Sequence, residues 1–110
     1  MNPGPGEIWL ADLGLAAKTR PVVIVSRRDS EPPRALVVYV PLTTQYRNSR
    51  YEIPIARLPF LNQDSFANVQ GIASLPTIRL ERRLGRVSDQ TMDQIRAALI
   101  YALDLHAKLG

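Results

Sequence analysis

The sequence predicts a small, mainly β fold, a barrel or a sandwich, with one C-terminal helix. Short β-branched or alternating apolar runs recur, with turn signals about every ten residues. The apolar spacing changes to a helical period only after Ser88. Apolar residues make up 45% of the 110 residues, a normal value for a globular chain. This length suits one domain, so we expect residues 1–110 to form a single unit.

The expected strands are short and separated by polar or proline-containing loops. Pro54 has no N–H to donate to a ladder, so it lies either in an edge strand or at the end of a strand. Gly71 marks a bulge or a close approach. The loop at 27–34 is charged, contains Pro32 and Pro33, and is expected to be exposed. We expect strands at residues 7–13, 22–26, 35–41, 51–55, 65–74 and 84–87.

The last quarter of the chain predicts an amphipathic helix of about 20 residues. Ser88 is a suitable N-cap and Asp89 lies in the first turn, where a negative charge is favoured. Val87 and Met92 occupy the two positions of a hydrophobic staple. The apolar stripe expected to face the sheet consists of Met92, Ile95, Leu99, Ala102 and Leu103. Off this stripe lie Tyr101, Leu105 and His106, which are available to a partner subunit.

The charge of the chain is basic and unevenly distributed along the sequence. The formal net charge is +4 and the pI is about 10.0, with twelve Arg and two Lys among the cations. Residues 15–50 hold seven cations against two anions, a local net charge of +5. An arginine fork binds phosphate bidentately and stacks on bases. A nucleic acid and an acidic protein both fit this charge, as does a basic surface without a partner.

The sequence lacks the residues that several classes of chemistry need. There is no Cys, and His106 is the only His. A histidine at the C-terminal end of a helix is favoured by the helix dipole, so we expect His106 to have a structural role and not a catalytic one. No ligand cluster with metal spacing and no Gly-rich nucleotide loop is present, so neither a metal nor a cofactor is expected. No apolar run approaches a membrane span of about 18 residues, and no signal peptide is expected at Met1, which favours the cytoplasm.

Two short motifs carry candidate chemistry. Pro21 restricts the residue before it to extended backbone, so Arg20 is presented at the entrance of a strand. Thr43, Thr44 and Gln45 follow the next strand, where hydroxyl and amide groups bind phosphate oxygens or simply cap a turn. If these strands are neighbours, Arg20 and Thr43 lie close together at one end of the sheet. The alternative is an ordinary solvated arginine beside a strand-initiating proline.

The same segments resemble the MazF/PemK/Kid toxins in order and spacing over nearly the whole chain. The matching runs are Gly6–Leu13 (GEIWLADL), Arg20–Ser26 (RPVVIVS), Pro41–Gln45 (PLTTQ) and Arg82–Asp89 (RRLGRVSD). The resemblance implies an SH3-like antiparallel barrel of the CcdB/Kid/MazF type with a C-terminal helix, acting as a cytoplasmic homodimer. It implies a toxin of a type II toxin–antitoxin module, a metal-independent, sequence-specific endoribonuclease that cleaves single-stranded RNA, chiefly mRNA. It also implies a cognate antitoxin, acidic and partly disordered, that occupies the RNA groove.

Carried over by residue, Arg20 matches the catalytic arginine of the family and Thr43 its catalytic Ser/Thr position. The loop at 14–19 is shorter than is usual in the family, with Thr19 where a His often precedes the arginine. Gln70 and Ala73 stand where many relatives carry an acid and an arginine. Trp9 fits a core position better than a base-stacking one. The expected RNA-binding residues are Lys18, Arg27, Thr44, Gln45, Tyr46, Arg47, Arg50, Asn68 and Gln70.

Two alternatives stay open at this point. One is a catalytically weak relative that acts as a binding module for RNA or an acidic protein. The other is a poison of DNA gyrase on the same fold, as in CcdB. The Arg-Pro and Thr-Thr-Gln motifs favour the nuclease, and RNA cleavage products separate it from the binding module.

Overall fold

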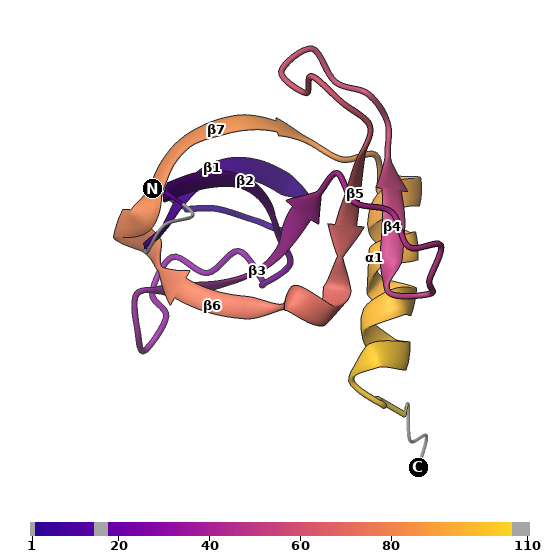
Figure 1. Ribbon diagram of the computed structural model, residues 1–110. Helices are drawn as coiled ribbons and strands as arrows, with labels where there is room; N and C mark the ends of the chain where they lie inside the picture. The colour runs from indigo at the N-terminus through magenta and orange to yellow at the C-terminus, as the bar shows by residue number, and fades with distance from the viewer. Residues whose placement is uncertain (1, 15–17, 107–110) are drawn as a thin grey trace.

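A strongly curved antiparallel sheet and one C-terminal helix make up the fold in the computed structural model, which describes residues 2–14 and 18–106 (Figure 1). The mainly β fold with a C-terminal helix is therefore confirmed. The strands are β1 (Glu7–Gly14), β2 (Lys18–Ile24), β3 (Leu36–Thr43), β4 (Glu52–Ile55), β5 (Ser65–Asn68), β6 (Ala73–Pro76) and β7 (Leu80–Arg86). The helices are α1 (Asp89–Ala102) and two 3-10 turns, η2 (Val69–Gly71) and η3 (Thr77–Arg79). None of them is long and apolar enough to cross a membrane, as judged over the described residues.

The strand β3 lies at the centre of the sheet. The order of strands is β4-β5-β3-β2-β1-β7, and β6 also pairs with β3. One edge of β3 pairs with β2, with Val22 opposite Pro41. Its other edge pairs with β6 over its first half and with β5 at its end. The strand β4 lies at one end of the order and contains Pro54, as expected for an edge strand.

Two apolar clusters lie on opposite faces of β2. Val23 belongs to the cluster that contains Met92 and Ile95 of α1. Val22 and Ile24 belong to the other cluster, which the curved sheet encloses together with side chains of β6 and β7. A strand that is buried on both faces reads as a continuous β-branched run, which explains why this segment shows no polar alternation.

The strand bounds correct the sequence prediction in four places. The strand β2 begins four residues earlier than expected, and β3 continues to Thr43, so Arg20 and Thr43 both lie within strands while Thr44 and Gln45 follow β3. The single strand predicted at 65–74 is wrong, because η2 interrupts it: the Asn68 side chain accepts a hydrogen bond from the Gln70 N–H and caps a 3-10 turn. The strand β7 begins at Leu80, which is buried opposite Ala11, rather than at residue 84.

The close approach expected at Gly71 is confirmed. A Cβ atom at this position would lie 2.7 Å from Cγ of Pro41. The turn after β5 therefore packs directly against β3, two residues before Thr43.

The helix α1 is shorter than the expected 20 or so residues. It spans 14 residues and ends before Asp104, whose φ of 54° lies in the left-handed region. The expected cap is present, since Ser88 Oγ accepts a hydrogen bond from the Thr91 N–H. Leu103 was wrongly assigned to the buried stripe: it is 47% exposed, and Ala98 is buried instead. Also exposed are Tyr101, Leu105 and His106, as expected.

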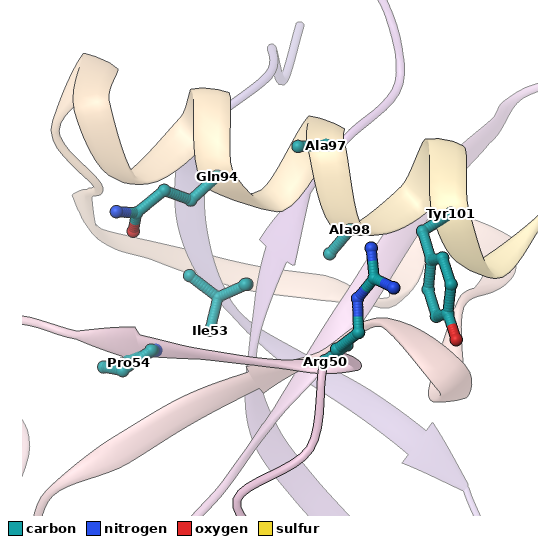
Figure 2. A pocket seen from close by; sticks show the side chains of 7 residues that line it. All are labelled: Arg50, Ile53, Pro54, Gln94, Ala97, Ala98 and Tyr101. Carbon is teal, nitrogen blue, oxygen red and sulfur yellow. The ribbon is translucent and has the colours of Figure 1, made fainter.

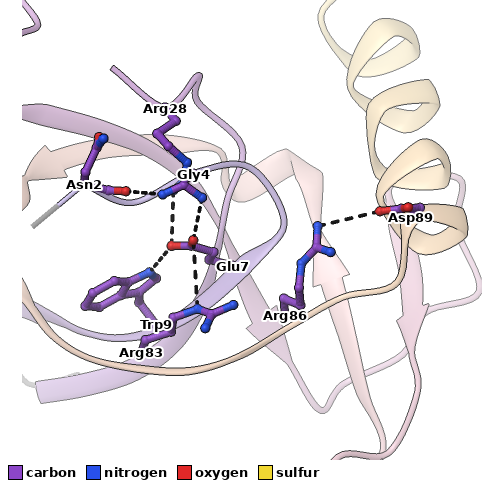
Figure 3. Close-up of polar contacts among 8 residues, drawn as sticks. All are labelled: Asn2, Gly4, Glu7, Trp9, Arg28, Arg83, Arg86 and Asp89. Carbon is purple, nitrogen blue, oxygen red and sulfur yellow. Dashed lines mark hydrogen bonds and ion pairs between the residues drawn. The ribbon is translucent and has the colours of Figure 1, made fainter. Parts of the chain in front are cut away.

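The N-terminal segment is held by the buried carboxylate of Glu7 (Figure 3). One oxygen accepts hydrogen bonds from the Gly4 N–H and the Trp9 indole, and the other pairs with Arg28 at 2.7 Å. Burial alone would raise the pKa of Glu7, but these hydrogen bonds, above all that from Arg28, lower it below its ordinary value of 4.5. Trp9 packs on the cluster inside the sheet, which supports its core role.

Candidate functional site

Arg20 and Thr43 come together in one hollow although 22 residues separate them in the sequence. The strands β2 and β3 are antiparallel with Val22 opposite Pro41, and two residues further this register sets Arg20 opposite Thr43. The Arg20 side chain is exposed and Thr43 is half-buried. The hollow has a volume of about 210 Å³ and is lined by Arg20, Pro21, Leu42, Thr43, Thr44, Gln45 and Ser65.

A second hollow continues from the first, because Thr43 and Gln45 line both. It is larger, about 480 Å³, and reaches across β5 to the η2 turn. Its further lining residues are Arg47, Ser49, Tyr51, Glu52, Asn68 and Gln70. We call the two hollows together the Thr43 groove. Most of the polar side chains that the sequence assigned to RNA binding therefore lie along one depression.

The hydroxyl of Thr43 has one of its two predicted roles, that of capping a turn. Its oxygen accepts a hydrogen bond from the Gln45 N–H at 3.1 Å, which is the turn-capping role. The hydroxyl can still donate its proton to another acceptor, because an O–H group rotates about the C–O bond. A threonine that caps a turn and lines a groove is held in place and can donate to a phosphate oxygen.

Ser65 is a lining residue that the sequence did not single out. It is the first residue of β5, only 6% exposed, and its Oγ donates to the Gln63 carbonyl at 3.3 Å. It adds a second hydroxyl to the hollow that holds Arg20 and Thr43. A serine after Asn, Gln and Asp reads as an ordinary turn residue, so no local signal distinguishes it.

Glu52 is the second lining residue that sequence reasoning missed. Its side chain is 8% exposed and faces the polypeptide that links β3 to β4. The carboxylate accepts hydrogen bonds from the N–H of Arg47, and from both the N–H and the hydroxyl of Ser49. No local signal in the sequence indicates this burial, because carboxylates are mostly exposed and are buried only with partners. Here the partners are backbone N–H groups and the Ser49 hydroxyl of the loop that precedes Glu52.

The remaining predicted RNA contacts lie in different places. Arg47 lines the groove, whereas Arg50 does not: its guanidinium lies 3.7 Å from the ring centre of Tyr101. This contact belongs to a separate slot of about 410 Å³ between β4 and α1, where Ile53, Ala97 and Ala98 form the apolar wall (Figure 2). The structure thus directs Arg50 towards the helix and away from the Thr43 groove.

Arg27 is also not brought to the groove. It follows the far end of β2 from Arg20 and lines a separate hollow beside Asp29. Lys18 begins β2, and its side chain lies outside the described residues, as does most of the short loop at 14–19. The basic charge of residues 15–50 is therefore distributed over several faces.

An aromatic pair lies beside Thr43, because Phe66 is the register partner of Thr43 between β3 and β5. The ring of Tyr46 stacks on Phe66, with ring centres 4.3 Å apart and an angle of 8° between their planes. Tyr46 is 48% exposed, and its hydroxyl donates to Asn48 Oδ1 at 3.0 Å. Thr44 and Gln70 are exposed, while the Asn68 oxygen is engaged in capping η2 and leaves its NH₂ group for other contacts.

The chemistry that this groove can support is recognition of a phosphate diester. A guanidinium offers a planar fork of donors, and the hydroxyls and amides beside it add further donors. Among the described residues no group of His, Asp or Glu has the arrangement of a metal site. Glu52, the carboxylate of the lining, is occupied by backbone donors. His106 lines neither hollow and pairs with Asp104 at 3.1 Å.

Comparisons with known proteins agree with one another. A family model described as PemK-like, MazF-like toxin of type II toxin–antitoxin system matches residues 4–103. The probable endoribonuclease MazF5 of Mycobacterium tuberculosis is 32% identical over 109 residues, covering 93% of this chain and 94% of that protein. Endoribonuclease MazF4 of the same species is 36% identical over 105 residues, covering 94% of each chain.

Solved structures show the same likeness. The Mycobacterium tuberculosis toxin MazF-mt6 matches with a TM-score of 0.80 at 29% identity, over 92% of this chain and 99% of that chain. A mycobacterial endoribonuclease in complex with its cognate antitoxin matches with a TM-score of 0.79 at 31% identity, over 96% and 99% of the two chains.

Proposed function

The chain belongs to the PemK-like, MazF-like toxin family, and we propose on this basis that it is a toxin of a type II toxin–antitoxin module that cleaves single-stranded RNA. We propose a metal-independent, sequence-specific endoribonuclease that acts on mRNA in the cytoplasm. The observation that carries the proposal is the presence of Arg20 and Thr43 in one hollow, at the positions that match the family's catalytic pair. The relatives named as endoribonucleases support the same reaction class.

The reaction needs no nucleophile from the protein, because RNA supplies its own. The 2′-oxygen forms a bond to phosphorus, the bond from phosphorus to the 5′-oxygen breaks, and the proton lost by the 2′-hydroxyl is balanced by one gained at the 5′-oxygen. The products are a 2′,3′-cyclic phosphate and a 5′-hydroxyl. Two N–H groups of Arg20 would bind the non-bridging oxygens, where negative charge grows in the transition state. Thr43 would hold a phosphate oxygen or orient the 2′-hydroxyl.

The rest of the groove would hold the flanking nucleotides. Arg47 is placed to contact the phosphate backbone, and the exposed amide of Gln70 is placed to read a base edge. Thr44, Gln45 and Asn68 add polar groups between them. Because single-stranded RNA presents unpaired base edges, amide side chains of this kind can supply sequence preference.

An acidic, partly disordered segment of a cognate antitoxin would occupy the same groove. The cationic lining by Arg20 and Arg47 supports this proposal, as does the related mycobacterial endoribonuclease that was solved with its antitoxin. For a homodimer, the support is a group of exposed apolar side chains at the end of α1. This group comprises Ile100, Tyr101, Leu103 and Leu105. Molar mass by light scattering, for the wild type and for Leu103→Ser, tests this assignment.

The deciding experiment incubates antitoxin-free wild type and Arg20→Ala with a long single-stranded RNA in EDTA. Cut positions and end groups are then mapped. Discrete cuts that leave 5′-hydroxyl ends, lost in Arg20→Ala, support the nuclease. Intact RNA across diverse sequences, from folded wild-type protein, overturns it in favour of a binding module or a gyrase poison.

A further inference from the structure

The geometry points to a stacking platform beside the proposed cleavage site. We infer that Tyr46, supported from behind by Phe66, stacks on the base of a nucleotide that adjoins the cleaved phosphate. This inference rests on the proposed ribonuclease function and adds to it a contact with a base face, which is distinct from the polar contacts along the groove.

The two rings form a parallel stack with one side turned outward. Their centres lie 4.3 Å apart at an angle of 8°, so one face of Tyr46 is covered by Phe66. Phe66 is half-buried in β5, whereas Tyr46 is 48% exposed. A flat ring that is fixed on one face and exposed on the other presents the surface on which an unpaired base stacks.

The platform lies next to the proposed catalytic threonine. Phe66 is the register partner of Thr43 between β3 and β5, so their Cα atoms lie about 5 Å apart and their side chains share one face of the sheet. Tyr46 follows Thr43 by three residues. A phosphate held by Arg20 and Thr43 therefore has this ring within the reach of a neighbouring nucleotide.

The loop that carries Tyr46 is fixed before any ligand binds. The Tyr46 hydroxyl donates to Asn48 Oδ1, and Asn48 has a φ of 54°, a conformation that asparagine tolerates better than most residues. Glu52 accepts hydrogen bonds from the N–H groups of Arg47 and Ser49, the residues on either side of Asn48. A preorganised ring binds a base without first paying for its own ordering in entropy.

Charge favours RNA over an apolar partner at this platform. Arg47 follows Tyr46 directly and lines the groove, and Gln45, which precedes Tyr46, lines the hollow that contains Arg20. A nucleotide satisfies both groups, because its phosphate meets the cation and its base meets the ring. Every base has a flat face, so this contact adds affinity with only a mild preference for the larger purines.

The test uses RNA that contains the mapped cut sequence with a 2′-deoxynucleotide at the cut, which removes the nucleophile. Single 2-aminopurine substitutions report stacking at each position through loss of fluorescence. We expect one position next to the cut to be quenched most strongly by the wild type and by Tyr46→Phe, which keeps the ring. The quench at this position should be lost in Tyr46→Leu, and Phe66→Leu should weaken it.

The kinetic counterpart is a change in KM. Loss of a base stack that is present in ground and transition states alike should raise KM of Tyr46→Leu by about 5-fold to 100-fold, with a smaller fall in kcat. Tyr46→Phe, which keeps the ring, should have a KM close to that of the wild type. Circular dichroism and thermal unfolding confirm that each variant is folded.

Different outcomes separate this inference from the function on which it rests. If wild-type protein neither cleaves nor binds RNA, the proposed function itself fails. If the wild type cleaves RNA while Tyr46→Leu keeps the same KM and the same quench, the platform alone is overturned. Weakened binding of an acidic antitoxin peptide by Tyr46→Leu, with RNA binding unchanged, would also overturn it in favour of a protein contact.

Discussion

Both carboxylate oxygens of Glu52 accept a hydrogen bond from the backbone N–H of Arg47, at 3.0 and 3.3 Å. Ser49 adds its own N–H at 3.2 Å and its hydroxyl at 3.1 Å. One buried carboxylate therefore fixes the path of the segment that carries Tyr46 and Arg47 past the groove.

Replacing Glu52 by Gln should destabilise the protein and weaken its binding to RNA. One acceptor oxygen becomes an NH₂ donor that faces backbone donors, and a buried polar group left without a partner costs about 1–3 kcal/mol. Urea unfolding measures the free energy, and fluorescence anisotropy with uncleavable RNA measures the affinity. The exposed Glu81→Gln is the matched control. Identical unfolding midpoints and slopes for Glu52→Gln and wild type would contradict this role.

Arg20→Ala should reduce kcat by about 100-fold to 1,000-fold while leaving the fold intact. The side chain is exposed, so its loss should change the free energy of unfolding by no more than about 0.5 kcal/mol. Arg20→Lys keeps the charge but loses the bidentate fork and should restore only part of the rate. Single-turnover cleavage measures this, with the loop residue Arg34→Ala as the arginine control. An equal loss in Arg34→Ala would show that overall charge is what matters.

Acid should weaken the fold through Glu7. Its pKa is lowered in the folded protein from 4.5, so its contribution to stability is complete above about pH 4.5 and is lost as the pH falls through the lower folded value. The difference in unfolding free energy between wild type and Glu7→Gln should therefore shrink as the pH is lowered from 6 towards 3. Urea titrations at several pH values test it. A difference that stays constant over this range would show that Glu7 does not contribute to the loss of stability in acid.

Gly71→Ala should destabilise the protein by about 1–3 kcal/mol, since overpacking forces a shift of the neighbouring groups. The added Cβ would lie 2.7 Å from Cγ of Pro41, and a proline ring cannot rotate aside. Gly85→Ala is the comparison, because its Cβ would meet the Phe60 ring at 3.0 Å, where a flexible side chain can give. Thermal unfolding of both variants should rank Gly71→Ala as the less stable one.

The parts of the fold that local chemistry determines could be predicted from the sequence. The β-branched run after Pro21 marks a strand buried on both faces, and Ser88 marks the start of the helix. The interruption of the strand predicted at 65–74 could not be seen. There a side-chain cap by Asn68 competes with the ladder, and the turn packs through Gly71 on Pro41, which is distant in the sequence.

The site too was predictable only where local chemistry determines it. Arg20 and Thr43 could be brought together in advance because each lies at the end of an adjacent antiparallel strand. Arg27 follows the predicted strand at 22–26, at the opposite end from Arg20, so the same reasoning places it away from the groove. Arg50 could not be placed, because its position in the sequence does not tell which side of the β3–β4 connection it faces. Ser65 reaches the groove only through the pairing of β5 with β3, a contact between distant parts of the chain.

The edge strand β4 has a consequence for how this protein meets other chains. It is four residues long, and Pro54 within it has no N–H to offer. A strand from another molecule that aligned along β4 would form an interrupted ladder, so the sheet resists growth at that end. A toxin with such an end can stay dispersed in solution when no antitoxin covers it.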